Sequence, residues 1–248
     1  MRMDASVVES GHEWATACAV QQRFMQHTAP ECGLFDYSAL CRQAHQLGGD
    51  CYDFAPLAHQ RLTVMVGDAS GKGFAAALMI STVQSSLRTA ALFTGGDPAA
   101  LLGIVNRQVY ASSLTNRYAT LFYGVFDGVA GTLRYVNAGH FPPMVLRRDG
   151  SIEWLEAGGA PVGMFADWTY QEGSFQLEPG DLFLAYTEVV EAMNPSGEEW
   201  GIQNLWKAAE AIRPRSAKNV VSTIFRSMDE FSRGIRNDDA TVAVVRMR

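Results

Sequence analysis

The sequence lacks the patterns that most covalent-catalysis and soft-metal sites need. None of its four cysteines forms a C-x-x-C pair, and its five histidines share no spacing typical of metal ligands. It contains no G-x-S-x-G motif, so the serine elbow of a hydrolase is absent, and no cysteine has a recognisable histidine partner. Because no protein nucleophile stands out, the sequence favours a water molecule activated by a metal ion. The unpaired cysteines are typical of a reduced, cytosolic protein.

Long hydrophobic runs and clustered charges of one sign are also missing. No apolar stretch approaches the roughly 20 residues of a membrane span, and the first residues show no signal-peptide pattern. The net charge is −6, from 20 basic and 26 acidic residues, and the basic residues are scattered, which argues against a nucleic-acid partner. A hydrophobic content of 48% is enough for a real core. We therefore expect a folded cytoplasmic protein without a membrane span.

The order of the hydrophobic patterns predicts an α+β fold. Helices follow the early strands, and the last strands follow a β-rich middle, so we expect two packed, mostly antiparallel sheets flanked by helices rather than alternating βαβ units. The expected strands are 35–44, 50–55, 62–67, 118–126, 132–137, 144–147, 152–155, 169–177, 181–186 and 240–246, and the expected helices are 7–26, 74–92, 99–114, 202–211 and 216–232. Residues 1–30 are expected to form a helical arm and residues 31–248 the main domain.

Four acidic residues at turns and strand ends carry the strongest chemical signal. They are Asp50 after two glycines, Asp68 after the run 62–66, Glu188 after the run 182–186, and Asp238 before the run 241–245. Crowded carboxylates must either take up protons or bind a cation. Ligand sets made of oxygen atoms alone favour hard ions such as Mg²⁺ or Mn²⁺. The pattern therefore predicts a metal site wherever the fold brings these residues together.

Each motif also has a plainer explanation when it is taken alone. The segment 67–73, Gly-Asp-Ala-Ser-Gly-Lys-Gly, is similar to a phosphate-binding P-loop, but Val66 and Gly73 break that motif. Two interpretations of this segment therefore remain. It is either only a tight turn, or a turn whose glycines let the backbone approach a ligand closely. Gly48-Gly49-Asp50 resembles the turn of diguanylate cyclases, although Cys51-Tyr52 replaces its Glu-Phe pair, and a β-turn is commoner.

Two further polar residues have competing interpretations. His140, in a turn between two expected strands, is either a proton donor or, more commonly, a residue that shapes the turn. Asp239 follows Asp238, and adjacent acids before a strand usually form a solvated turn. Neither residue by itself decides the function.

Six motifs in order resemble those of the bacterial PPM-type, metal-dependent serine/threonine protein phosphatases. The closer branch is that of stage II sporulation protein E and the sigma-factor-regulating phosphatases. The motifs are Leu47–Phe54, Val66–Ala76, Asn137–His140, Gly163-Met164, the stretch from Gly180-Asp181-Leu182 to Glu191-Ala192, and Asp238–Thr241. The resemblance covers the chain from about residue 33 onward. Each motif alone is weak evidence for the family, whereas six motifs in the same order are specific to it.

The resemblance implies a phosphatase with two Mg²⁺ or Mn²⁺ ions that activate a bridging water. In that scheme Asp68 bridges both ions, Asp50 and the backbone carbonyl of Ala69 serve one ion, and Glu188 and Asp238 serve the other. Asp50, Asp68 and Asp238 are the expected catalytic residues; the further candidates are Gly49, Gly67, Gly71, Gly73, Asp239 and His140. The implied substrate is a small phosphorylated regulatory protein of the anti-sigma-factor-antagonist type. The first helix resembles one that leads into this domain, which suggests a homodimer or a regulatory docking of the helix onto the domain, beside the plainer alternative of simple packing on the core.

The chain departs from the family pattern at Glu188-Val189, where Thr-Asp-Gly is usual. Glutamate keeps the charge but adds a methylene, and Mg²⁺ demands near-ideal octahedral geometry. A β-branched valine does not readily take a positive φ. A second hypothesis is therefore a pseudophosphatase that binds its partner without turnover, and a diguanylate cyclase is a distant third.

Overall fold

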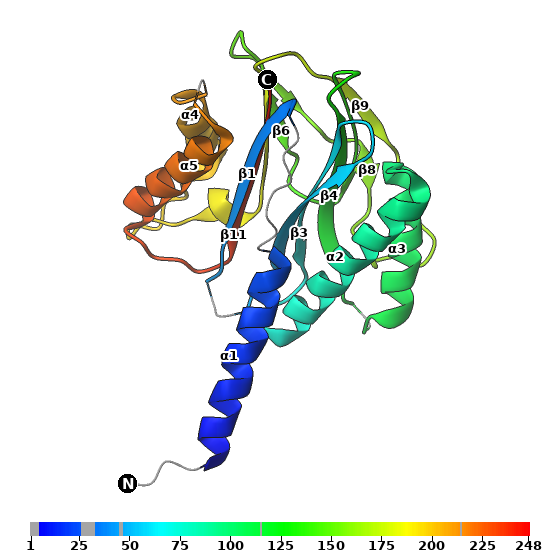
Figure 1. Cartoon of the computed structure of the whole chain (residues 1–248). Coiled ribbons are helices and arrows are strands. Elements are labelled where there is room, and N and C mark those ends of the chain that lie inside the picture. Colours follow the sequence, from blue (N-terminus) through cyan, green and yellow to red (C-terminus); the bar gives the residue numbers. More distant parts are fainter. Residues whose placement is uncertain (1–4, 26–32, 45–46, 115, 214) are drawn as a thin grey trace.

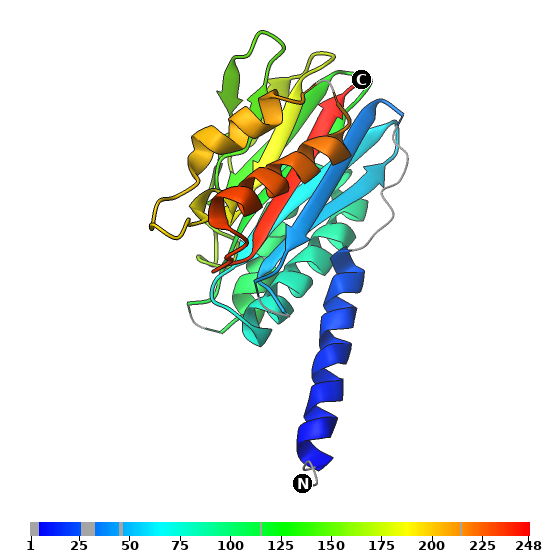
Figure 2. The same ribbon diagram turned by 90° about the vertical axis from the view of Figure 1, so that its left-hand side faces the viewer.

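Two β-sheets packed face to face form the centre of the molecule, and two helices cover each outer face (Figure 1). The computed structural model describes residues 5–25, 33–44, 47–114, 116–213 and 215–248. Figure 2, turned by 90°, shows the two orange helices lying across the strands of the first sheet. The prediction of an α+β fold with two mostly antiparallel sheets flanked by helices is confirmed.

The described helices and strands follow one another in the expected order. The helices are α1 (Ala5–Met25), α2 (Phe74–Thr94), α3 (Pro98–Ser112), the 3-10 helix η1 (Glu188–Glu191), α4 (Gly201–Glu210) and α5 (Ala217–Ser232). The strands are β1 (Phe35–Arg42), β2 (Asp50–Leu57), β3 (Arg61–Ala69), β4 (Ala119–Asp127), β5 (Thr132–Ala138), β6 (Met144–Leu146), β7 (Ile152–Trp154), β8 (Gly158–Gly159), β9 (Gly173–Gln176), β10 (Leu182–Tyr186) and β11 (Ala240–Met247).

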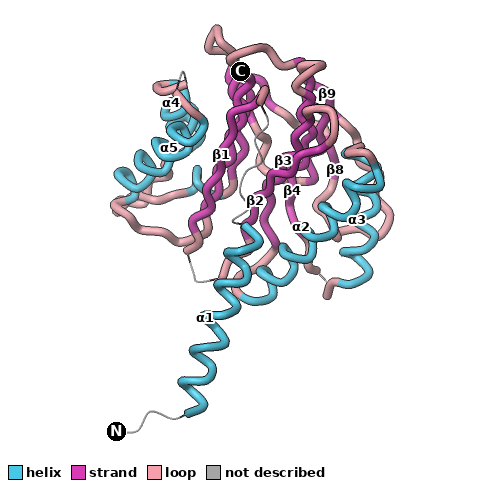
Figure 3. Tube along the Cα trace, in the orientation of Figure 1, coloured by secondary structure: helices cyan, strands magenta, loops and turns pink. Residues whose placement is uncertain are grey.

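The strands divide between the two sheets in a way that mixes early and late parts of the chain (Figure 3). The first sheet has the order β1-β11-β10-β6-β7, and the second has the order β2-β3-β4-β5-β8 with β9 also beside β5. The ladders are antiparallel except for the short parallel pair β5–β8. No helix among the described residues is long and apolar enough to cross a membrane.

Three layers of buried side chains hold the sandwich together. The layer between the sheets is rich in aromatic residues, with Phe122 and Phe126 of β4 against Phe183 of β10 at ring-centroid distances of 5.3 and 5.1 Å. A second layer joins α2 and α3 to β3 and β4, and a third joins α4 and α5 to β10 and β11. Strands buried on both faces explain the nearly continuous hydrophobic runs in the sequence.

Strand register brings the acidic motifs to one end of the sandwich. In the second sheet, Asp50 at the start of β2 lies opposite Asp68 near the end of β3. In the first sheet, Tyr186 at the end of β10 pairs with Val242 near the start of β11. The segments just beyond these two residues carry Glu188 and the Asp238-Asp239 pair, so both sheets present carboxylates at the same end.

The helix α1 extends from the body of the molecule, and its described contacts with the body lie between Trp14 and the C-terminal end of the helix (Figure 1). The Gln21 side chain donates to the Gly48 carbonyl at 2.7 Å and accepts from the Gly48 N–H at 3.2 Å. Trp14 packs edge-on against Phe74 of α2, with ring centroids 4.2 Å apart. The boundary expected at residue 30 lies outside the described residues, so the division into arm and domain stays a prediction.

The structure departs from the picture given by the sequence in three places. The strand expected from residue 169 begins only at Gly173, and β8, made of two glycines, carries no hydrophobic alternation that would have predicted it. Val189 does not take the positive φ that the family glycine suggested. It lies in η1 and is fully buried beside the helices α4 and α5, so it packs in the core instead of straining a turn.

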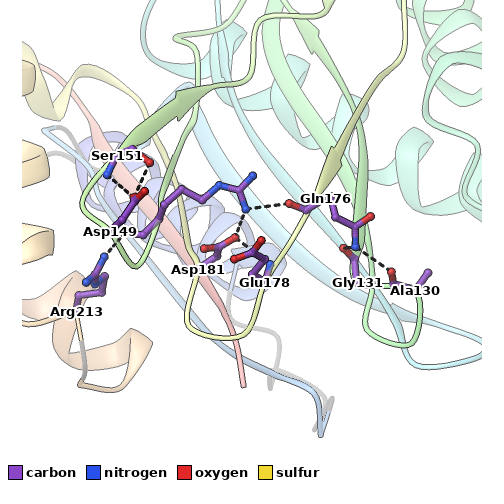
Figure 4. A network of polar contacts seen from close by, with 9 residues as sticks. Ala130, Gly131, Asp149, Ser151, Gln176, Glu178, Asp181 and Arg213 are labelled. Carbon is purple, nitrogen blue, oxygen red and sulfur yellow. Dashed lines mark hydrogen bonds and ion pairs between the residues drawn. The ribbon is translucent and has the colours of Figure 1, made fainter.

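The motif residue Asp181 serves the opposite end of the sandwich from the acidic motifs (Figure 4). Its carboxylate accepts from Arg147 Nη1 at 2.6 Å and from the Glu178 backbone N–H at 2.9 Å. Arg147 also donates to the Gln176 carbonyl at 3.0 Å and stacks over Phe175. This buried ion pair ties the β9–β10 connection to β6 and is structural.

Candidate metal centre

Asp50 is the most deeply buried carboxylate at the acidic end. Its Oδ2 atom accepts hydrogen bonds from Thr187 Oγ1 at 2.7 Å and from Thr241 Oγ1 at 2.6 Å. Its Oδ1 atom is buried and makes no hydrogen bond among the described residues. Burial, and then the negative charge of Glu188, raises the pKa of Asp50 well above its usual range. One oxygen is thus fixed by hydroxyl groups while the other is left available.

Asp68 and Glu188 complete a cluster around Asp50. One oxygen of each of the three carboxylates lies within 4.8 Å of the others. Asp68 comes from the end of β3, whereas Glu188 begins η1 directly after β10, so the cluster joins both sheets. The longer glutamate side chain therefore reaches the cluster from its own strand end.

The cluster has a strong electrostatic preference for an added positive charge. Burial, followed by the charges of Glu188, Asp238 and Asp239, raises the pKa of Asp68 to about 7. Burial also raises the pKa of Glu188 to about 7, and the charges of Asp238 and Glu191 add to the rise. Like charges in a poorly solvated site disfavour ionisation, and a bound cation would relieve the repulsion.

Asp238 faces the same cleft but has a partner of its own. Its Oδ2 atom lies 2.6 Å from Lys72 Nζ, and its Oδ1 atom accepts the Asp239 N–H at 3.0 Å. Asp238 is not among the three residues whose ligand atoms cluster within 4.8 Å. The ion pair is exposed on both sides, and such pairs contribute only about 0–1 kcal/mol, so Lys72 is easily displaced from Asp238.

Asp239 organises the backbone rather than the cluster. Its Oδ1 atom accepts the Ala44 N–H at 2.8 Å, and its Oδ2 atom accepts the Gly49 N–H at 3.0 Å. Burial raises the pKa of Asp239, against the opposing effect of these N–H donors. The solvated turn expected for this acidic pair therefore describes Asp238 better than Asp239, which fastens the start of β11 to the loop before β2.

Two of the candidate glycines are required by close approach. A Cβ on Gly49 would lie 2.7 Å from Asp68 Oδ1 and 3.0 Å from the Ala69 carbonyl oxygen. Gly71 has a φ of 94°, and a Cβ there would lie 2.0 Å from Arg117 Nη1. The Ala69 carbonyl thus faces the loop that presents Asp50, next to the Asp68 carboxylate.

The other two glycines have structural roles. Gly67 sits against β4, where a Cβ would lie 2.8 Å from the Thr120 carbonyl. Gly73 precedes α2, and its carbonyl accepts the Ala77 N–H at 3.0 Å. Neither offers a side chain to the cluster.

His140 lies outside the acidic cleft. Its Nδ1 atom is 2.9 Å from Thr120 Oγ1, and its backbone N–H donates to Asn137 Oδ1 at 2.8 Å. Burial lowers the pKa of His140 to about 4. A neutral, buried ring that contacts Thr120 of β4, with a backbone N–H bonded inside the turn, fits the turn-shaping role better than that of a proton donor.

The carboxylates open into a cleft with two adjoining lobes. One lobe, of about 180 Å³, is lined by Asp68, Lys72, Glu188 and Asp238, and the other, of about 200 Å³, shares Glu188 and Asp238 with it. The buried Asp50 Oδ1, which no described residue pairs with, and the all-oxygen donor set fit a hard divalent cation. The residues present therefore suit the metal that the resemblance implies.

Three residues of this site escaped the sequence analysis. Thr187 and Thr241 orient Asp50, and Lys72 pairs with Asp238. Thr187 directly precedes Glu188, and Thr241 ends the last motif. Their positions next to candidate ligands were the only feature of the sequence that could have pointed to them. Their hydroxyl contacts span 137 and 191 residues and depend on the meeting of the two sheets.

Comparisons with known proteins agree with this geometry. The family model described as Stage II sporulation protein E (SpoIIE) matches residues 58–248. Protein IcfG of Synechocystis sp. is 29% identical over 258 residues, which cover 91% of this chain and 40% of that protein. Phosphoserine phosphatase RsbU of Bacillus subtilis is 27% identical over 233 residues, which cover 94% of this chain and 69% of that protein. The chain thus spans less than half of the first relative.

Solved structures show the same fold. The SiaA-PP2C domain of Pseudomonas aeruginosa has a TM-score of 0.82 and 21% identity, over 99% of this chain and 100% of that one. The catalytic domain of serine threonine protein phosphatase PstP in complex with two manganese ions has a TM-score of 0.62 and 16% identity, over 86% of this chain and 97% of that one. The resemblance stated from the motifs is confirmed, and because the family model matches more than half of the residues, the chain belongs to the Stage II sporulation protein E (SpoIIE) family.

Proposed function

We propose that the chain is a metal-dependent protein serine/threonine phosphatase. The observation that carries this proposal is the buried cluster of Asp50, Asp68 and Glu188, with one Asp50 oxygen that has no partner among the described residues. Membership of the SpoIIE family supports it, as does the similarity to RsbU, a phosphoserine phosphatase. The absence of a recognisable nucleophile motif in the sequence agrees with hydrolysis by an activated water.

The cofactor in this proposal is a pair of Mn²⁺ or Mg²⁺ ions. When bound, such a pair clamps the phosphoryl group and lowers the pKa of a bound water. Asp50, Asp68, Glu188 and Asp238, with the Ala69 carbonyl, are the proposed ligands. The manganese in the PstP structure supports the choice of metal.

The chain's own residues prepare the site in two ways. Thr187 and Thr241 hold the Asp50 carboxylate in one orientation, because both donate to its Oδ2 atom. Asp239 holds the Gly49 N–H and so fixes the loop from which Asp50 emerges. Supporting partners of this kind typically change metal affinity or activity by about 10–100-fold when they are removed.

The proposed substrate is a small phosphorylated regulatory protein of the anti-sigma-factor-antagonist type. The support is the family and the similarity to RsbU and its branch, not a contact in this molecule. A homodimer formed through α1 is a related proposal, because the exposed fractions of Val20 and Phe24 on this helix are 52% and 39%. A cytoplasmic location stays a prediction.

The second candidate is a pseudophosphatase that binds its partner without turnover. The observation that favours it is Glu188, which stands where the family pattern has aspartate and which clusters with Asp50 and Asp68 while Asp238 pairs with Lys72. In this reading the site binds one cation tightly and a second one poorly.

One experiment separates the two functions. The full chain is given para-nitrophenyl phosphate and a phosphoserine peptide, with Mn²⁺ or with EDTA, and Mn²⁺ binding is measured on the same samples by calorimetry. We expect hydrolysis that requires the metal and that Asp68→Asn abolishes while circular dichroism stays unchanged. Metal binding without any hydrolysis of either compound would favour the pseudophosphatase, and near-native turnover by Asp68→Asn would contradict the two-metal assignment.

A further inference from the structure

A groove lies on the surface where α2 begins and α3 ends, beside the acidic cleft. One part, of about 350 Å³, lies between Leu78 of α2 and Val109 of α3, and a second part, of about 420 Å³, extends to Met164. Leu114 and Arg117 line both parts, so the two parts adjoin. Figure 1 shows the two helices side by side on the outer face of the second sheet.

The groove has large apolar side chains that are open to solvent. The exposed fractions of Leu78 and Leu114 are 71% and 79%, and both side chains line the groove. Exposed apolar side chains that gather at a hollow, instead of standing singly, mark surfaces that bind another molecule. Tyr110 also lines the groove and is 48% exposed, and tyrosine is enriched at protein interfaces.

The groove carries positive charge without a described carboxylate beside it. The segment 69–126, which contains both helices, has one acidic residue, Asp97, and this residue lies at the opposite end of α3, where it pairs with Arg134. Arg117 Nη1 donates to the Ser70 carbonyl at 2.6 Å, but none of the ion pairs among the described residues includes Arg117. In a protein with a net charge of −6, such a surface favours an acidic partner.

The groove meets the acidic cleft at Gly71. Gly71 lines the cleft lobe of about 180 Å³ together with Asp68 and Glu188. Arg117 lies directly on the other side, since a Cβ added to Gly71 would clash with Arg117 Nη1. A polypeptide with its phosphorylated residue in that lobe can therefore continue across Gly71 into the groove.

We propose that this groove docks the segment of the phosphoprotein substrate that flanks its phosphorylated residue, and that this segment carries a large apolar side chain and a carboxylate. The apolar side chain packs against Leu78 and Leu114, and the carboxylate pairs with Arg117. The proposal rests on the proposed function, because it takes a phosphoprotein as the occupant. It goes further in naming the surface that selects one phosphoprotein from another.

The first test measures docking without turnover. Two short labelled peptides carry a serine flanked either by leucine and glutamate or by alanine and glutamine, and their dissociation constants for the full chain are measured in EDTA by fluorescence anisotropy. The leucine–glutamate peptide should bind about tenfold more tightly. Leu78→Glu should remove that advantage, whereas Leu92→Glu, at the other end of α2 and with an exposed fraction of 78%, is the matched control and should keep it.

A third peptide, with leucine and glutamine, isolates the charge. The native chain should prefer glutamate over glutamine about twofold to fivefold, as expected for one exposed ion pair. Arg117→Gln should abolish this preference. A merely structural role of Arg117, through its bond to the Ser70 carbonyl, would change the binding of both peptides equally.

Turnover separates this proposal from the phosphatase reaction. With Mn²⁺, Leu78→Glu should lower kcat/KM for the phosphorylated leucine–glutamate peptide about tenfold relative to that for para-nitrophenyl phosphate, which has no flanking segment. Peptide binding without hydrolysis of either compound would contradict the phosphatase and leave the groove in place. The groove proposal is overturned if the leucine–glutamate peptide does not bind or if Leu78→Glu and Leu92→Glu act alike. It is also overturned if Leu78→Glu splits a native dimer in light scattering, because the face would then belong to a second copy of the chain.

Discussion

Replacing Asp68 by asparagine should make the metal-free protein more stable while it destroys the proposed active site. The side chain keeps its shape but loses its charge, next to the carboxylates of Asp50 and Glu188. In the native chain, burial and then the charges of Glu188, Asp238 and Asp239 raise the pKa of Asp68 from 3.8 to about 7. The folded state therefore holds this proton more tightly than the unfolded state does.

The sign and size of the effect follow from that difference. A carboxyl group with a raised pKa in the folded state contributes stability at low pH, and this contribution is lost as the pH rises from about 4 to about 7. At about 1.4 kcal/mol per pH unit the full loss is about 4 kcal/mol. Between pH 5 and pH 8 the advantage of Asp68→Asn should grow by about 2–3 kcal/mol.

Urea denaturation in EDTA measures this directly. With slopes of about 1–3 kcal/mol per molar urea, the midpoint of Asp68→Asn should exceed that of the native chain by about 1–4 M at pH 8 and by clearly less at pH 5. Asp167→Asn, which changes an exposed carboxylate outside the cleft, should show no such trend. If Asp68→Asn is no more stable than the native chain at pH 8, or if its advantage does not shrink at pH 5, the electrostatic reasoning fails.

Three further predictions concern the surroundings of the cluster. Thr187→Val removes one of the two hydroxyl groups on Asp50 and should weaken Mn²⁺ binding about 10–100-fold; unchanged affinity in calorimetry would show that the hydroxyl does not orient the ligand. Glu188→Asp restores the family residue and should improve Mg²⁺ binding more than Mn²⁺ binding, because Mg²⁺ tolerates less distortion; equal effects on both metals would contradict this. Gln21→Ala removes the hydrogen bond between α1 and the Gly48 carbonyl, and deletion of residues 1–28 removes the whole helix. We expect either change to alter the hydrolysis rate or the oligomeric mass, and an unchanged rate and mass would contradict a regulatory role for α1.

Much of the fold follows from local sequence patterns. The helix α2 begins directly after Gly73, as its glycine loop and its apolar spacing predict, and the turn between β4 and β5 forms where Asp127-Gly128 predicts it. The strand β8 could not be predicted, because it consists of Gly158 and Gly159 and pairs through its backbone alone. Val189 shows the limit of family patterns, since burial in the core and not a turn decides its conformation.

The candidate site was predictable only in its carboxylates. Asp50, Asp68 and Glu188 stand at strand ends, and strand ends of a layered fold tend to meet at one edge. The roles of their neighbours depend on distances that no local pattern contains. Thr241 is bonded to Asp50 across 191 residues of sequence. Asp238 and Asp239 have different roles because Asp238 is the one that pairs with Lys72.

The pairing of β1 with β11 has a consequence for how the chain folds. Phe35 lies opposite Met247, so the first sheet cannot be completed until the segment 240–247 has been synthesised. Contacts between residues so far apart in sequence slow folding, because a large loop must close before they form. The acidic cluster is held by Thr241 of that same strand. During synthesis, β2 and β3, which carry Asp50 and Asp68, are therefore made long before Thr187 and Thr241, whose hydroxyl groups orient Asp50.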